Sequence, residues 1–407
     1  MRSPLWRATI ALMSDHQNST LGDVDYRLLL PFLLHAILVQ SVTGLTRVTT
    51  SYRAIELDFS VSWYGAISSG YALLPIFGAL PLGRWIDRGN DARAIWIGSA
   101  FNLLGALGLW LAPNGPWSLL TWTVVGGVGH IFLMAGHQMF VVRCAGPKGR
   151  ESVLGHYMVA LAFGQMLGPI LIGWTAGAAA IPPTEQLFLI AACVSGIGMA
   201  LAFAMRPAPD AKRRGAGARP VSLRDLLRVH GLVPVILASV VTVTSIDLVL
   251  IYLPLLGAER GLSAGHVGAL LTTRAIASIA SRLVYSRMIA MFGRARLTFG
   301  SMVAGAIGFI VMAAPVPLPV MYAAMVAMGL GLGLSIVLCL SNVVELAPIE
   351  ARGTAMTMRL TGNRIGQFVI PFAAGFLGAA AGVGAILGVT AAGLLASALS
   401  VRRALRR

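Results

Sequence analysis

Charged residues are scarce in this chain of 407 residues. Only 11% of the residues are Asp, Glu, Lys or Arg, and just 15 are acidic, whereas a soluble globular domain averages about 25% charged residues. The scarcity argues against an ordinary soluble domain. Because 57% of the residues are hydrophobic, the composition predicts a protein embedded in lipid.

The chain also offers few groups that could hold a metal ion or form a covalent intermediate. Its three cysteines stand singly, without the spacing of a metal site or a disulfide framework. The sequence has no His-Glu-x-x-His zinc motif, no Ser or Cys nucleophile with a base, and no phosphate loop. We therefore expect no metal and no cofactor, and neither a membrane-embedded enzyme nor an ATP-driven pump.

Long apolar runs, in contrast, recur from end to end. About twelve of them approach the ~20 residues that a helix needs to cross a bilayer. They are continuously apolar rather than alternating, which favours helices over the strands of a membrane barrel. The predicted fold class is an all-α membrane protein. The runs lie at residues 28–50, 62–82, 94–112, 117–142, 153–176, 186–205, 232–256, 264–286, 297–314, 320–344, 354–378 and 383–401.

The basic residues predict how the chain is oriented. Most of the 31 Lys and Arg residues fall in the two tails and in alternate loops, which places both termini on the cytoplasmic side of the cell's inner membrane. Only Arg47, Arg53 and Arg260 are assigned to the opposite side. The net charge of +16 therefore indicates topology and contact with anionic lipids, and no nucleic-acid partner is expected.

The longest polar interruption, residues 206–231, divides the spans into two halves. Its first part is rich in Pro, Gly and Arg, which is typical of a linker. The predicted organisation is a cytoplasmic tail over residues 1–26, a six-helix bundle over 27–205, the cytoplasmic linker over 206–231, a second six-helix bundle over 232–401 and a basic tail over 402–407.

An internal repeat relates the two halves. At an offset of 203 residues Gly65 aligns with Gly268, and the register continues to the basic loops. At an offset of 202 residues "GQMLGPILIG", residues 164–173, aligns with "GQFVIPFAAG", residues 366–375. The fifth and eleventh spans are therefore equivalent. Parallel six-span repeats joined by a basic linker are an architecture of secondary transporters.

The loop after the second span carries the sequence "GRWIDRGNDAR", residues 83–93. Together with the repeat, it resembles the signature of the major facilitator superfamily across nearly the whole chain. Gly83, Asp87, Arg88 and Arg93 match that signature, while other residues replace the Gly and Arg expected between them. The resemblance implies two pseudo-symmetric six-helix bundles that work by alternating access.

The same resemblance implies a cytoplasmic gate. In the superfamily the Asp of this loop contacts the start of the eleventh span, where helix N-terminal amides favour a carboxylate. We expect Asp87 to form such a latch near Arg352. The other expected gate residues are Arg88, Arg93 and Glu345.

In the fifth span, "GQMLGPILIGW" resembles the glycine-rich signature of the superfamily's drug/proton antiporters. Gly164 and Gly168 stand one turn apart and allow a neighbouring helix to approach, while Pro169 bends the span. Packing of small residues in general is the alternative explanation. The resemblance favours an exporter. The fourth span lacks the Arg of those exporters, so another group would have to carry protons.

Three ionisable side chains lie deep in the spans. Counting 1.5 Å per residue, we place Asp247, Arg274 and Arg364 near the middle of the seventh, eighth and eleventh spans. A charge there costs about 3 kcal/mol and normally faces a cavity or a partner. Two arginines against one aspartate leave a positive charge that an anionic substrate could neutralise. An ion pair between Arg274 and Asp247 is the structural alternative.

Arg in the eighth span with a basic residue in the eleventh resembles the superfamily's oxalate and monocarboxylate carriers. Asp247 is the expected proton-coupling carboxylate, with His130 as the alternative carrier. Arg359 is expected to snorkel toward the cytoplasmic headgroups and line the approach. The predicted substrate-binding residues are Arg274, Arg364, Asn363, Gln40 and His130.

The sequence thus predicts a monomeric, proton-coupled transporter that exports a small organic anion or amphiphile. Two other readings stay open: a multidrug efflux antiporter in which the arginines are structural, and uptake of an organic acid by proton symport. The expected partners are the small-molecule substrate, protons and the lipid bilayer.

Overall fold

The computed structural model describes residues 26–144, 150–205, 226–348 and 351–405. The predicted N-terminal tail and most of the predicted linker lie outside these ranges. The elements, in chain order, are α2 (Tyr26–Glu56), α3 (Val61–Trp85), the π-helical turn η1 (Ile86–Asn90), α4 (Asp91–Leu111), α5 (Pro116–Arg143), α6 (Arg150–Ala176), α7 (Thr184–Ala202), α9 (Leu232–Glu259), α10 (Ala264–Leu283), α11 (Tyr285–Phe292), α12 (Arg294–Ala313), α13 (Leu318–Leu346) and α14 (Arg352–Leu405).

Local sequence explains where several of these helices begin. Pro116 occupies the first turn of α5, a position where its missing N–H costs nothing and its fixed φ suits the helix. Ser263 caps α10, and its hydroxyl accepts a hydrogen bond of 3.2 Å from the backbone N–H of His266. Between such ends the continuously apolar runs stay helical, because a backbone in lipid has to satisfy its hydrogen bonds internally.

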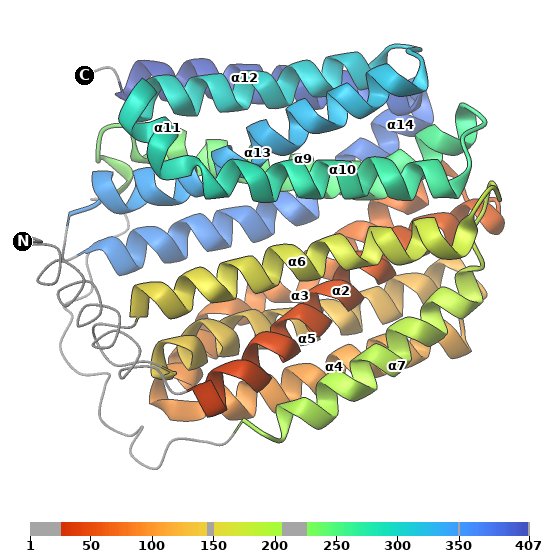
Figure 1. The fold of residues 1–407 in the computed structure, drawn as a ribbon, viewed down its shortest axis with the longest axis horizontal. Helices are drawn as coiled ribbons and strands as arrows, with labels where there is room; N and C mark the ends of the chain where they lie inside the picture. The colour runs from red at the N-terminus through yellow and green to blue at the C-terminus, as the bar shows by residue number, and fades with distance from the viewer. Residues whose placement is uncertain (1–25, 145–149, 206–225, 349–350, 406–407) are drawn as a thin grey trace, which may run out of the picture.

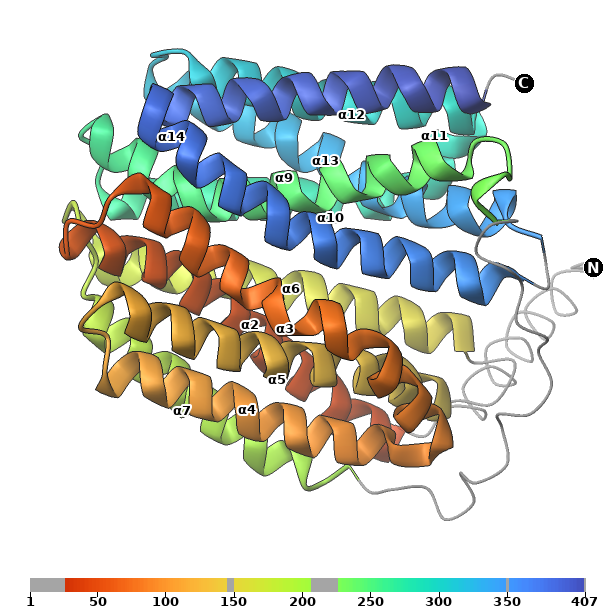
Figure 2. The same cartoon turned by 180° about the vertical axis from the view of Figure 1, so that it is seen from behind.

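The helices form two bundles, one of α2 to α7 and one of α9 to α14 (Figures 1 and 2). Most helices pack mainly on members of their own bundle, whereas α3 packs on α14 of the other bundle as extensively as on its own neighbours. The main contacts between the bundles are those of α3 with α14, α6 with α10, and α2 with α9. Each predicted apolar run falls on a described helix, except that the eighth is divided between two. The start of α2 and the end of α14 lie at the same end of the molecule.

Two bends account for how the predicted runs are distributed over the helices. α14 contains the last two runs, and Gly382 separates them with a non-helical backbone (φ 77°) that only glycine adopts readily. α10 and α11 are bent by 62° and share the eighth run. Of the described helices, nine are long and apolar enough to cross a membrane, or ten if this bent pair is one span.

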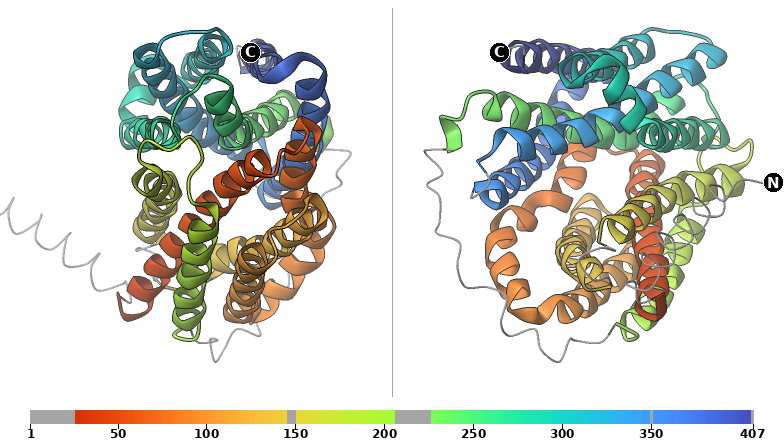
Figure 3. Two further views of the ribbon diagram at one scale, coloured as in Figure 1. Left: turned by 90° about the vertical axis from the view of Figure 1, so that its right-hand side faces the viewer. Right: turned by 60° about the vertical axis from the view of Figure 1, so that its left-hand side comes forward.

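The bundles touch most closely at the end opposite the start of α2 (Figure 3, left). A Cβ atom on Gly65 of α3 would lie 2.9 Å from the Cα of Gly375 in α14, and one on Gly268 of α10 would lie 2.7 Å from the Cα of Gly173 in α6. The backbone N–H of Ala264 also donates a 2.8 Å hydrogen bond across to the other bundle. Only glycine permits such an approach.

These two glycine contacts are counterparts in the internal repeat. Gly65 aligns with Gly268, and Gly173 aligns with Gly375, so each contact is the image of the other. At the opposite end of the same interface helices, a Cβ on Gly83, Gly155 or Gly353 would meet no heavy atom within 4 Å. The tight glycine contacts between the bundles in the described residues are thus concentrated at one end.

We expect Gly65→Val to open this end. The valine Cβ would collide with the carbonyl oxygen of Pro371, so the contact cannot close. The measurement is the distance distribution between spin labels on the exposed residues Ala178 and Ala258, one in each bundle, with Cys193 replaced by Ser. A second, longer distance should appear.

The control is Gly78→Val on the same helix, because a Cβ there would meet no heavy atom within 4 Å. It should leave the distance distribution unchanged. An unchanged distribution in Gly65→Val as well would show that this glycine contact does not hold the end closed.

Two histidines form a hydrogen-bonded pair in the core of the first bundle. His35 Nδ1 lies 2.9 Å from His137 Nε2, and His35 Nε2 lies 3.0 Å from the Ser99 hydroxyl, so α2, α4 and α5 are joined. Both histidines are fully buried. Buried polar groups with hydrogen-bond partners of this kind fix helix packing.

Candidate functional site

Asp247 of α9 is the centre of a buried polar network between the two bundles. Its Oδ1 atom lies 2.5 Å from Nη1 of Arg47 in α2, and the side chains of this ion pair are 6% and 10% exposed. Its Oδ2 atom accepts a 2.7 Å hydrogen bond from Gln367 in α14. The carboxylate therefore binds one helix of its own bundle and one helix of the other.

The network extends on both sides of Asp247. Arg364 donates a 3.1 Å hydrogen bond to the Gln367 amide oxygen. On the other side, the Arg47 guanidinium lies over the Tyr71 ring, 5.0 Å from its centroid, an arrangement in which the ring face attracts the cation. The His130 ring lies 5.2 Å from the same tyrosine ring, and its Nδ1 atom has no hydrogen-bond partner among the described residues.

Positive charge exceeds negative charge in this region. Arg47, Arg364 and Arg274 are all within electrostatic range of Asp247. Arg274 is 7% exposed, and its Nε atom lacks a hydrogen-bond partner within the described ranges. One carboxylate cannot neutralise three guanidinium groups. The arrangement therefore presents guanidinium groups of the kind that bind carboxylate or phosphate groups.

Arg47 corrects the sequence analysis. The sequence analysis ended the first span near residue 50 and counted Arg47, close to that end, among the basic residues on the side opposite the cytoplasm. In the structure α2 continues to Glu56, so Arg47 lies well inside the helix. A signal was present: Thr43, Thr46 and Thr50 recur at the spacing of one helix face, which indicates that the helix continues with a polar side.

The alternative ion pair between Arg274 and Asp247 is also wrong. Asp247 pairs with Arg47, which approaches from the other bundle. This alternative failed because a sequence places charges along helices but does not tell which helices meet.

Asn363, Arg359 and Gln40 lie in helix contacts. The Ser239 hydroxyl of α9 donates to Asn363 Oδ1 at 3.1 Å, and Arg359 donates to that hydroxyl at 3.2 Å. Arg359 is only 8% exposed, so the expectation that it snorkels to the headgroups is wrong for this conformation. Gln40 donates to the Met134 sulfur at 3.5 Å. The substrate contacts expected of Asn363 and Gln40 stay predictions.

The expected gate residues lie at the end of the molecule where α2 begins. Arg88, Arg93 and Arg352 are exposed, while Glu345 forms a 2.6 Å ion pair with Arg294 of its own bundle. The side chain of Asp87 lies outside the described part of the chain. The latch between Asp87 and the start of α14 therefore stays a prediction.

The glycines of the fifth span pack α6 on α2. A Cβ on Gly164 would lie 2.5 Å from the Ile37 carbonyl oxygen, and one on Gly168 would lie 2.5 Å from the Leu45 nitrogen. The Pro169 carbonyl oxygen faces the other bundle, 2.8 Å from where a Gly268 Cβ would stand. Nowhere in the described residues do three His, Cys, Asp or Glu side chains converge to hold a metal ion.

Comparisons with known proteins agree with this architecture. The sequence matches the Major Facilitator Superfamily over residues 32–371, with a second, overlapping match over residues 235–407. An uncharacterized MFS-type transporter of Escherichia coli O17:K52:H18, YcaD, is 31% identical over 108 residues, which cover 26% of this chain and 28% of that protein. The chain thus matches less than a third of that relative's length.

Solved structures share the fold at low sequence identity. A mutant of the nucleoside transporter NupG superposes with a TM-score of 0.78 at 13% identity, covering 93% of this chain and all of that one. The human organic anion transporter MFSD10 gives 0.67 at 14% identity, covering 93% and 99%. The xylose transporter XylE from E. coli, in an inward-open conformation, gives 0.74 at 14%, covering 93% and 95%.

The fold and the matches together define the class: a multi-pass helical membrane protein that carries small molecules and is not an enzyme. The chain belongs to the major facilitator superfamily. Its predicted all-α membrane fold and its assignment as a secondary transporter are confirmed.

Proposed function

We propose that this protein is a proton-coupled transporter of a small organic anion in the cell's inner membrane, with both termini in the cytoplasm. The observation that supports this most directly is the group of three arginines around Asp247 between the bundles. Arginine presents a planar fork that matches carboxylate and phosphate. The anion would bind between Arg364 and the arginines of the facing helices.

The ion pair supports a mechanism of coupling. In the empty site the Asp247 carboxylate is ion-paired with Arg47. An anion that binds Arg47 in its place breaks this ion pair, and a proton on Asp247 keeps the net charge of the site unchanged. Proton and anion would therefore be bound together, and the loaded site would no longer hold the ion pair that links α2 to α9. This linkage favours cotransport of the two in one direction, driven by whichever gradient is larger.

Export of the anion by proton antiport, expected from the fifth-span resemblance, is the rival mechanism. In antiport, proton and anion bind in turn, so that a proton bound at Asp247 would displace the substrate. The geometry supports the opposite sign, because the anion and the Asp247 carboxylate compete for the same cations. The two mechanisms predict opposite responses to a pH gradient.

The test is accumulation of labelled anions in proteoliposomes with an imposed pH gradient. Cotransport predicts accumulation when the lumen is alkaline, and antiport predicts it when the lumen is acidic. Protein-free vesicles measure passive entry of the protonated acid and are subtracted. Accumulation of cationic dyes but of no anion would contradict the proposal and would favour the multidrug alternative with structural arginines.

A further inference from the structure

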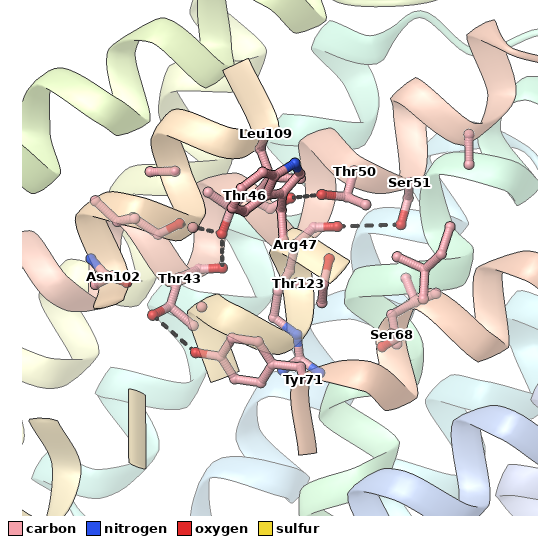
Figure 4. Close-up of a pocket in the computed structure, with 18 of the residues that line it drawn as sticks. Thr43, Thr46, Arg47, Thr50, Ser51, Ser68, Tyr71, Asn102, Leu109 and Thr123 are labelled. Carbon is pink, nitrogen blue, oxygen red and sulfur yellow. Dashed lines mark hydrogen bonds between the residues drawn. The ribbon is translucent and has the colours of Figure 1, made fainter. Parts of the chain in front are cut away.

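A recess adjoins the Asp247 site, mostly within the first bundle (Figure 4). It lies among α2, α3, α4 and α5, with Ile251 of α9 also in its wall, and both Arg47 and Tyr71 line it. One helix face of α2 supplies Thr43, Thr46 and Thr50 to its wall. Trp122 and Leu109 supply apolar surface. The recess is thus lined by hydroxyl groups, the Asn102 side chain and apolar side chains, and its one charged residue, Arg47, is the partner of Asp247.

The threonine hydroxyl groups of α2 use their hydrogens within the helix. Thr43, Thr46 and Thr50 each donate their hydroxyl hydrogen to the backbone carbonyl four residues earlier, at 2.7–2.9 Å. A hydroxyl has one hydrogen and two lone pairs. Because the hydrogens are used within the helix, Thr46 and Thr50 offer the recess hydrogen-bond acceptors, while the Thr43 oxygen already accepts a 3.4 Å hydrogen bond from Tyr71. The wall therefore suits a ligand that donates hydrogen bonds.

The positive charge of Arg47 limits which hydrogen-bond donors on a ligand the recess can accept. The Arg47 guanidinium in the wall of the recess repels an ammonium group, and a buried unpaired cation is costly. The fitting donor is therefore neutral, such as a hydroxyl on an apolar carbon body.

We propose that this recess binds the hydroxyl-bearing, non-ionic end of the transported anion, whose acid group is held by the arginines around Asp247. The inference rests on the proposed function and adds the substrate class: hydroxylated organic acids with an apolar body. The recess would then select substrates, while Arg364 and Arg47 bind the group that all of them share.

The test compares matched acids with and without a hydroxyl group. The probes are 3-(4-hydroxyphenyl)propionate with 3-phenylpropionate, and 6-hydroxyhexanoate with hexanoate, and the readout is the Kd for the purified full-length protein. One net hydrogen bond corresponds to roughly a 2- to 10-fold difference in affinity. The hydroxylated acid of at least one pair should bind more tightly by about this factor.

Thr46→Val removes an acceptor while keeping the branched shape. It should reduce the preference for the hydroxylated acid to near unity and leave the Kd of the other acid unchanged; Thr50→Val serves if the first variant does not fold. The matched control is Thr121→Val, because Thr121 is exposed on α5 and makes the same backbone hydrogen bond at 2.8 Å. It should keep the preference.

The outcomes separate the two proposals. Equal binding of both members of each pair to the unmodified protein would overturn the hydroxyl subsite and leave the anion site standing. A preference that survives both threonine substitutions would overturn it as well. Failure of every acid to bind would count against the proposed anion transporter itself.

Discussion

Arg364→Gln is expected to weaken the binding of organic anions by about 100-fold or more, because a fork of two charge-assisted hydrogen bonds is lost. Arg364→Lys keeps the charge but not the fork and should weaken binding by roughly 10-fold. In the structure Arg364 donates a hydrogen bond to Gln367, and Gln367 donates one to Asp247. The measurement is the Kd of the best anion for each purified variant.

Arg403→Gln is the matched control, since it makes the same chemical change at an exposed position near the end of α14. Its affinity for the anion should stay unchanged. If Arg364→Gln also bound the anion with unchanged affinity and merely expressed poorly, Arg364 would be a structural residue. The result would then favour the alternative of a multidrug efflux antiporter with structural arginines.

Asp247→Asn is expected to abolish accumulation driven by a pH gradient, because an amide cannot take up and release the coupled proton. Exchange of labelled for unlabelled anion across the membrane, which needs no net proton movement, should continue. The measurement is the ratio of accumulation with and without the gradient, which should fall to one. Asp58→Asn, at an exposed position with a left-handed backbone that Asn tolerates, is the control.

Full accumulation in Asp247→Asn would transfer proton coupling to a histidine, with His130 as the first candidate because its Nδ1 atom is unpartnered. A double-mutant cycle tests the ion pair itself. Arg47→Gln and Asp247→Asn each leave one buried group without its partner, so the double variant should be less destabilised than the sum of the two single variants. Strict additivity of the changes in melting temperature would contradict the ion pair.

The hydropathy of the sequence predicted the positions of the helices well, and it also identified two residues of the site. Asp247 and Arg364 stand out because each interrupts a long apolar run, and a charge in such a run has to face a cavity or partner. The repeat predicted which helices are equivalent, and the glycine contacts at Gly65 and Gly268 follow that equivalence. These features depend on local sequence and on spacing, both of which are visible in the chain.

Which side chains pair within the site depends on how helices of the two bundles cross. Arg47 meets Asp247 because α2 and α9 cross between the bundles, and no local pattern encodes that crossing. The polar residues around and after Arg47 lowered the local hydropathy, so the predicted span ended near residue 50, short of the actual end of α2 at Glu56. Arg359 was placed by its distance from the helix end, although its neighbour Ser239 on another helix decides where it points.

The ion pair between α2 and α9 also constrains how the chain is made. Its two residues are 200 positions apart, so Arg47 leaves the ribosome long before Asp247 exists. An unpaired arginine at the centre of an inserted helix costs about 3 kcal/mol. The helix is 31 residues long, which exceeds the roughly 20 needed to span the bilayer. The newly inserted α2 is therefore long enough to shift along its axis so that Arg47 lies at the headgroups. Arg47 moves to its final depth when the second bundle is inserted and Asp247 becomes available as its partner.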